Sequence, residues 1–359
     1  MDPLAPQTRP SGPAPRQRDL ALDGLRTLAV LLMISSHTSR LILWDARRDW
    51  SRWALLIEPL TASLFLILVG ASLVHSWRSA ESRGRAAWYR KQALRAAALW
   101  AISCLFYSLE EGFHWPDAVF LSGILATIAY TILAGMPLVS RRHAAVFLIA
   151  VSAALAALEI HLDRTQTFWF MINAGNSPML PLLQFACLGA LGALALESRN
   201  RRIRPAIVTC AVLALAFILH RHAFADVFSK PLGRYETART VVSSSKETRI
   251  EKTIPYYNLR PILVPVIASM IVLAYALLAA LGPLWNRTAR VLFAPGRRSL
   301  DVYILHLSLL AILVLHAHGD LHPLKRNSHG DLALGTVILI CYLWACGRDI
   351  LRDRRADRA

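Results

Sequence analysis

Residues 22–37 read LDGLRTLAVLLMISSH, an apolar stretch interrupted by one acid, one arginine and one histidine. With this spacing Asp23, Arg26 and His37 fall on one stripe of a helix. Arg26 and His37 differ by about 20° in direction and are separated by roughly 16 Å along the helix axis. Charged groups are expensive to bury in lipid, so we expect this stripe to face the inside of a helix bundle or a water-filled cavity. A continuous cavity should then join Arg26 to His37.

The same spacing also fits a simpler arrangement. Arg26 would extend to one membrane interface and pair with Asp23, and His37 would lie near the headgroups on the other side. Periodicity alone does not separate the two arrangements.

A second polar helix face favours the cavity. Ser299, Tyr303 and His306 share a face of a later apolar segment and directly follow the basic pair Arg297 and Arg298. Counted from the start of that segment, they lie in its cytoplasmic half. The first face reaches the outer half of the membrane, and the second lies in the cytoplasmic half. Together they predict a polar channel through the bundle.

The composition places these helices in a membrane. The chain has 359 residues, of which 55% are hydrophobic and 18% charged, and its net charge is +17. Such values exclude a disordered chain and disfavour a soluble domain. Apolar stretches and basic clusters alternate along the chain, as in multi-span membrane proteins with arginine-rich loops. The positive charge therefore does not indicate a nucleic-acid partner.

We expect an all-α, polytopic membrane bundle of about ten transmembrane helices, because a span needs about 20 apolar residues. The candidate segments are 21–43, 53–76, 92–110, 117–139, 143–161, 178–197, 203–222, 259–284, 300–318 and 331–348.

The lysines and arginines of the short loops predict the orientation. They concentrate on the side of the N-terminus, which predicts that both termini are cytoplasmic. Residues 1–19 should form a disordered cytoplasmic tail, 20–348 the membrane domain, 223–258 a long extracytoplasmic loop, and 349–359 a basic cytoplasmic tail. A bacterial inner membrane fits this organisation.

Several segments together resemble a known family. LDGLRTLAVLLMISSH (22–37) and APGRRSLDVYILH (294–306) resemble the first and last characteristic helices of the transmembrane acyltransferase superfamily. The superfamily includes the catalytic domain of heparan-α-glucosaminide N-acetyltransferase and the acyltransferase-3 proteins that O-acetylate surface polysaccharides. Segments 59–73, 89–99, 123–133 and 177–194 resemble the helices in between.

The two branches of the superfamily match different residues of the first helix. The acyltransferase-3 pattern, an arginine, ten residues and a histidine, is matched by Arg26 and His37, and the D-x-x-R of the heparan branch by Asp23 and Arg26. The following loop, 38–52, has no histidine, so a catalytic role for His37 depends on the acyltransferase-3 pattern.

The resemblance implies an acyl-CoA donor, with acetyl-CoA the expected one, and an acceptor hydroxyl or amine on an extracytoplasmic glycan or glycolipid. His37, with Asp23 in the catalytic set, would act as general base or as acyl carrier. The groups expected to contact the donor are the cations at the inner mouth and two residues of the second polar face: Arg26, Arg90, Lys91, Arg95, Arg297, Arg298, Tyr303 and His306.

The stretch LEEGFHWPD (109–117) offers an acceptor site on the outer side. An aromatic ring beside carboxylates suits a sugar, and the residues concerned are Glu110, Glu111, His114 and Trp115. The alternative is an interfacial tryptophan with solvated acids.

Other classes of function are less well supported. The five cysteines lack metal-ligand spacing, and no metal site is expected. A transporter or flippase could use the same polar faces, but the halves of the chain show no clear internal repeat. A non-catalytic scaffold would leave the shared direction of Arg26 and His37 unexplained.

Overall fold

The computed structural model describes most of the chain as helix. The described residues are 19–42, 49–80, 84–111, 113, 115, 117–120, 123–165, 167, 172, 179–196, 203–221, 263–285, 288–316 and 327–356. Every secondary-structure element among them is a helix, which confirms the all-α prediction. The expected N-terminal tail, apart from Asp19, and the expected loop 223–258 lie outside the described residues.

Ten long helices coincide with the ten expected segments. They are α1 (Leu20–Ile42), α2 (Asp49–Ala80), α3 (Arg85–Glu111), α5 (Ile124–Val139), α6 (Ala144–Thr165), α7 (Met179–Leu196), α8 (Ile203–Arg221), α10 (Leu263–Ala280), α14 (Ser299–His316) and α15 (Asn327–Ala356). Four helices of one turn are α4 (Asp117–Phe120), α11 (Gly282–Trp285), α12 (Ala289–Leu292) and α13 (Ala294–Arg297).

Several expected boundaries differ from the structure. Helix α3 begins at Arg85 and not at 92. The segment 117–139 is divided between α4 and α5. Gly123, directly before α5, has a φ of 102°, which is incompatible with a continuous helix and which glycine adopts without strain. The last helix continues past 348 to Ala356, so most of the basic tail extends α15.

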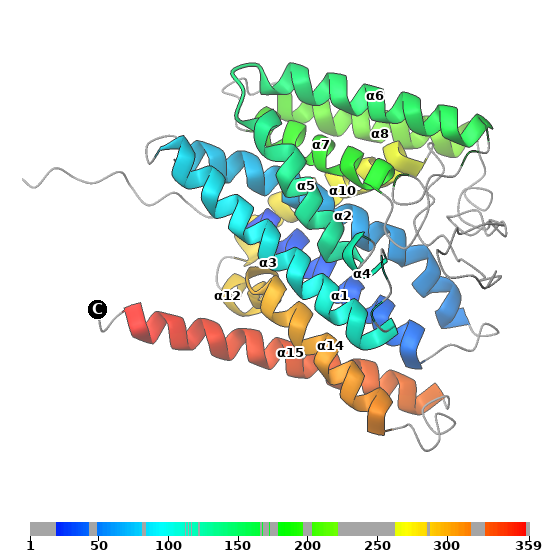
Figure 1. Cartoon of the computed structure of the whole chain (residues 1–359), viewed down its shortest axis with the longest axis vertical. Coiled ribbons are helices and arrows are strands. Elements are labelled where there is room, and N and C mark those ends of the chain that lie inside the picture. Colours follow the sequence, from blue (N-terminus) through cyan, green and yellow to red (C-terminus); the bar gives the residue numbers. More distant parts are fainter. Residues whose placement is uncertain are drawn as a thin grey trace, which may run out of the picture.

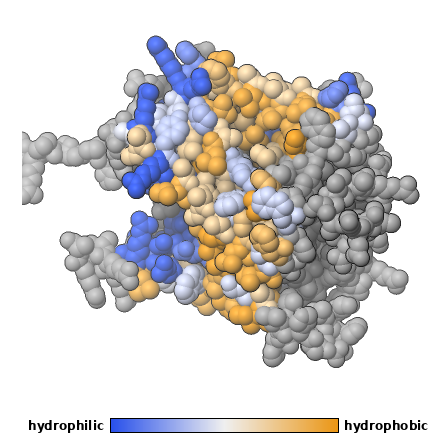
Figure 2. Space-filling view, viewed as in Figure 1, coloured by the Kyte–Doolittle hydropathy of each residue, from blue (hydrophilic) through white to orange (hydrophobic). Residues whose placement is uncertain are grey.

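The described helices have the length and composition of a membrane protein. Five could cross a bilayer, namely Leu20–Thr38, Leu60–Ala80, Arg85–Leu109, Ala144–Leu162 and Leu332–Arg352. Five shorter apolar helices accompany them. Figure 2 shows a broad apolar surface with hydrophilic residues gathered mainly along its left edge. The membrane character is thus supported, whereas ten complete spans and the orientation stay predictions.

Helix α1 lies inside the bundle. It contacts α2, α10, α13, α14 and α15, and it runs through the middle of the molecule between the α6–α8 pair and the α14–α15 pair (Figure 1). Ala29 and Val30 have no exposed surface. The inward orientation expected for this polar helix is therefore confirmed.

Helices α2 and α7 cross with their backbones almost in contact. A Cβ added to Gly70 would lie 1.9 Å from the carbonyl oxygen of Ala186, and one added to Gly189 would lie 2.0 Å from that of Ile67. Glycines allow this approach, which is typical of helix pairs in membranes. The contact anchors α2, whose opposite face lines the candidate site.

Candidate functional site

Helices α1 and α14 run in the same direction and in register. Gly296 of α13, three residues before α14 begins, donates its backbone N–H to Thr27 Oγ1 of α1 at 3.1 Å. Ten residues further along each, His37 Nδ1 lies 2.9 Å from His306 Nε2. Both pairs are separated by 269 residues. One close contact near the helix starts therefore sets which side chains meet deeper in the bundle.

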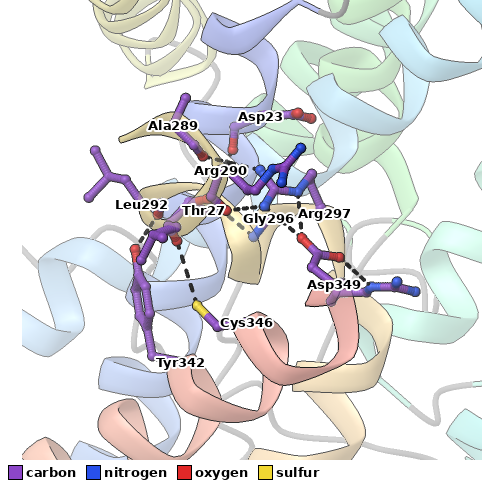
Figure 3. A network of polar contacts seen from close by, with 12 residues as sticks. Asp23, Thr27, Ala289, Arg290, Leu292, Gly296, Arg297, Tyr342, Cys346 and Asp349 are labelled. Carbon is purple, nitrogen blue, oxygen red and sulfur yellow. Dashed lines mark hydrogen bonds and ion pairs between the residues drawn. The ribbon is translucent and has the colours of Figure 1, made fainter. Parts of the chain in front are cut away.

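Gly296 makes the close contact possible. A Cβ at this position would lie 2.5 Å from both Asp23 O and Thr27 N. The Thr27 hydroxyl in turn donates to Asp23 O at 3.0 Å. Figure 3 shows Thr27 of α1 against Gly296, with the sticks of Arg297 beyond it. Only glycine lets α13 rest on α1 at this distance.

The meeting of the two histidines corrects one expectation from the sequence. His306 was expected in the cytoplasmic half of its helix, at a different depth from His37. The structure brings the two rings together because α13 packs against α1 at Thr27, so that α14 begins well inside the level at which α1 begins. The polar faces thus meet directly.

The hydrogen bonds define the neutral form of the pair. His306 Nδ1 lies 3.1 Å from the carbonyl oxygen of Val302, which can only accept, so this nitrogen carries the hydrogen. His306 Nε2 is then an acceptor and receives the hydrogen of His37 Nδ1. In the neutral pair His37 Nε2 is the unprotonated nitrogen, as a general base requires.

Tyr303 completes the aromatic wall. The two imidazole rings stack with centroids 5.1 Å apart, and the Tyr303 ring meets both edge-on, at 6.4 Å from His37 and 5.3 Å from His306. His306 has no exposed surface. Packing on two sides holds the orientation of the imidazoles.

A cavity of about 130 Å³ joins Arg26 to His37. Residues of α1, α2, α3, α5 and α14 line it, and its polar lining consists of Arg26, Ser36, His37, Thr61, Ser72, Arg95, Ser299 and Tyr303. The rest of the lining is apolar, with Met33 and Phe65 between the two ends. The expected cavity is confirmed, and the Arg26–Asp23 pair of the alternative arrangement is present as well.

Arg26 is held at one end of this cavity. Its Nη1 donates to Asp23 Oδ1 at 2.9 Å and its Nη2 to Ser72 Oγ at 3.0 Å. The Asp23 side chain is 1% exposed, whereas that of Arg26 is 29% exposed. Arg95 of α3 lines the same cavity. Two guanidinium groups thus face one space, which suits an anion.

Arg297 and Arg298 have a different environment from the one expected. Both bind Asp349 of α15, Arg297 Nη2 at 2.6 Å and Arg298 Nε at 2.9 Å. Arg297 also donates to the carbonyl oxygens of Ala289 and Arg290. Figure 3 shows Asp349 reaching from α15 to Arg297. Neither arginine is among the described residues that line the cavity.

The remaining predicted residues are not among the described residues that line the cavity. Arg90 and Lys91 are exposed on α3. Glu110 and Glu111 end α3, but their side chains, like all of His114, lie outside the described part of the structure. Trp115 is 64% exposed and meets Phe120 edge-on at 5.9 Å. The expected acceptor rim therefore stays a prediction.

Sequence reasoning missed Ser72, Phe65 and Asp349. Thr61, Phe65 and Ser72 recur at helical spacing on α2, a signal that was available but weak among apolar residues. Asp349 was assigned to the tail.

Among the described residues, no group of three or more His, Cys, Asp or Glu could hold a metal ion.

One comparison with known proteins bears on this site. The acyltransferase-3 family, described as an acyltransferase domain, matches residues 19–346 of the chain. No curated protein matches the chain. The matched region includes Arg26, His37 and His306, and it covers nearly the whole described bundle. The chain therefore belongs to the acyltransferase-3 family and is a membrane acyltransferase enzyme.

Proposed function

We propose that this enzyme transfers an acetyl group from acetyl-CoA to a hydroxyl or amine of a glycan or glycolipid, with His37 as the general base. The donor enters at the end that carries Arg26, and the acceptor reaches His37 from the opposite side. The single observation that carries this proposal is the cavity between Arg26 and a histidine whose unprotonated nitrogen is set by His306. The expected orientation, with both termini cytoplasmic, fits a bacterial inner membrane whose donor is inside.

The proposed reaction needs one base. His37 Nε2 takes the proton from the acceptor as its oxygen or nitrogen attacks the thioester carbonyl carbon. A new C–O or C–N bond forms, the C–S bond breaks, and the thiolate of CoA takes the proton back from His37. The His37 imidazolium donates its Nδ1 hydrogen to His306 Nε2, which stabilises the charged form.

The dimensions of the cavity suit a small acyl group on an extended arm. Arg26 and His37 are separated by roughly 16 Å along the helix, comparable with an extended pantetheine arm. Arg26 and Arg95 supply positive charge at the donor end. The volume of about 130 Å³ leaves little room for a long acyl chain beside such an arm, which favours acetyl.

In this proposal Asp23 acts through Arg26 rather than in the chemistry. It contacts Arg26 at 2.9 Å, at the end of the cavity remote from His37. A buried carboxylate on one side and the Ser72 hydroxyl on the other hold the guanidinium in one orientation. The transporter or flippase alternative uses the same residues, but membership of an enzyme family favours transfer.

The experiment measures thiol release from acetyl-CoA by the purified protein, with oligosaccharides that carry free hydroxyl and amino groups as acceptors. His37→Ala should lower the rate by about 10²–10⁴-fold, the range for loss of a general base. His161→Ala is the matched control, because His161 is exposed on α6. Transfer that survives His37→Ala would refute the assignment, and absence of acetyl-CoA binding by the wild type would favour a carrier.

A further inference from the structure

A second cavity, of about 790 Å³, lies at the end of the bundle that carries the basic turns. Trp77 and Arg78 of α2, Arg85 of α3, and the turn between α5 and α6 at 140–143 line it. Leu194 of α7 contributes to its apolar wall. This cavity is distinct from the one between Arg26 and His37, and the two have no described lining residue in common.

The second cavity is strongly cationic. Arg78, Arg85, Arg141 and Arg142 line it together with His143. No aspartate or glutamate is among the described lining residues. The Arg85 guanidinium lies 5.8 Å from the centre of the Trp77 ring, and that of Arg141 lies 4.9 Å from the centre of the Phe147 ring. Such contacts keep arginine side chains ordered while their N–H groups stay available to phosphate oxygens.

Helix α2 separates this cavity from the candidate active site. Phe65, Leu68 and Ser72 line the first cavity, whereas Val74, Trp77 and Arg78 line the second. At 100° per residue the two sets point in directions about 180° apart. A donor that reaches His37 past Arg26 therefore runs along the other face of α2.

The surroundings of the second cavity are apolar and face outward. Val146 lines it and is 65% exposed, and Phe147 and Ile149, which follow on α6, are 40% and 58% exposed. Helix α6 lies at the edge of the molecule (Figure 1). A ligand that fits both features has phosphate oxygens at one end and hydrocarbon at the other.

We propose that this cavity binds the headgroup of an anionic phospholipid, whose acyl chains extend along the outer face of α6. Arginines that gather between helix ends at the basic side of a membrane protein suit anionic headgroups. The bound lipid would tie the α5–α6 turn to the end of α2 and the start of α3. The site is independent of the proposed acyl transfer, so it can hold even if that function fails.

The test compares thermal unfolding of the full-length protein in neutral detergent with added dioleoyl-phosphatidylglycerol or dioleoyl-phosphatidylcholine. The anionic lipid should raise the melting temperature of the wild type by about 3–5 °C more than the zwitterionic lipid does. Arg141→Gln/Arg142→Gln should lose at least half of this difference. Arg348→Gln/Arg352→Gln is matched in charge, changes exposed residues of α15, and should keep it.

Further variants and a second ligand show whether the cavity binds a lipid headgroup or a nucleotide. Arg141→Lys/Arg142→Lys should keep most of the lipid effect, because lysine still offers a positive charge. If the Gln variant does not fold, Arg78→Gln/Arg85→Gln tests the other wall of the same cavity. Equal loss in the α15 variant would show a general surface-charge effect and overturn the proposal. Stabilisation by adenosine 3′,5′-bisphosphate that disappears in Arg141→Gln/Arg142→Gln would assign the cavity to a nucleotide instead.

Discussion

His37 Nδ1 and His306 Nε2 lie 2.9 Å apart, although 269 residues separate them in the chain. The contact exists because α1 and α14 run parallel from the point where Gly296 rests on Thr27. It turns a histidine that the sequence assigned to the donor channel into the group that orients the proposed base. His306 touches His37 and not the reacting atoms, so its proposed role is positioning.

Removing His306 should lower kcat while leaving donor binding intact. We expect His306→Ala to reduce kcat by about 10–100-fold, because His37 then loses the acceptor that holds its tautomer. KM for acetyl-CoA should change less than about twofold by steady-state kinetics. His306→Gln should recover part of the rate, since its amide oxygen can accept the hydrogen of His37 Nδ1. Equal loss in both variants would indicate a packing role only.

Arg26 should act mainly on donor affinity. Arg26→Gln removes a cation that Asp23 and Ser72 hold at the cavity end, and we expect acetyl-CoA to bind about tenfold more weakly, or about 1.4 kcal/mol. Calorimetric titration of the purified protein measures this. Arg348→Gln, at an exposed position on α15, is the charge-matched control. Unchanged donor affinity in Arg26→Gln would place the phosphates elsewhere.

Gly296 should be intolerant of even one methyl group. Gly296→Ala would bring a Cβ within 2.5 Å of the α1 backbone, so α13 must move away and the register of α14 with it. We expect a lower melting temperature and at least about a tenfold loss of transfer, since misplacement of about 1 Å costs this much or more. Gly335→Ala, where nothing lies within 4 Å, should be neutral or slightly stabilising. Full activity in Gly296→Ala would contradict the register argument.

Phe65 should limit the size of the acyl group. It lines the cavity between Arg26 and His37. We expect Phe65→Ala to raise the butyryl-CoA to acetyl-CoA ratio of kcat/KM by about tenfold, because an apolar pocket discriminates by about 1–3 kcal/mol per methylene. Leu64→Ala is the control: Leu64 is 1% exposed and is not among the described lining residues, so it should cost stability without changing the ratio.

Asp349 should contribute to stability more than to donor binding. Asp349→Ala leaves Arg297 and Arg298 without their shared carboxylate, and we expect a loss of about 1–3 kcal/mol in the free energy of unfolding, less than for a fully buried pair. Chemical unfolding in detergent measures it. Acetyl-CoA affinity should stay within about twofold. A clear gain in affinity would instead support the direct donor contact by these two arginines that the sequence predicted.

Much of the fold followed from hydrophobic pattern alone. Each expected apolar segment overlaps a long helix, because length and composition are local properties that a single stretch of chain carries. The inward direction of Arg26 and His37 was equally local, since helical periodicity places them on one face and lipid excludes them. The break at Gly123 was missed because an isolated glycine in an apolar run is compatible with both a helix and a turn.

The contacts between helices were beyond the reach of that reasoning. Depth counted from the start of a segment placed His306 away from His37, and only the packing of Gly296 on Thr27 corrects it. Likewise, the sequence predicts that Arg297 and Arg298 contact the donor, whereas in the structure both pair with Asp349 of α15. Sequence alone determined which faces of the helices are polar, because periodicity and the cost of burying charge act within one helix. Tertiary structure alone decided which polar groups meet, because that depends on close packing between segments hundreds of residues apart.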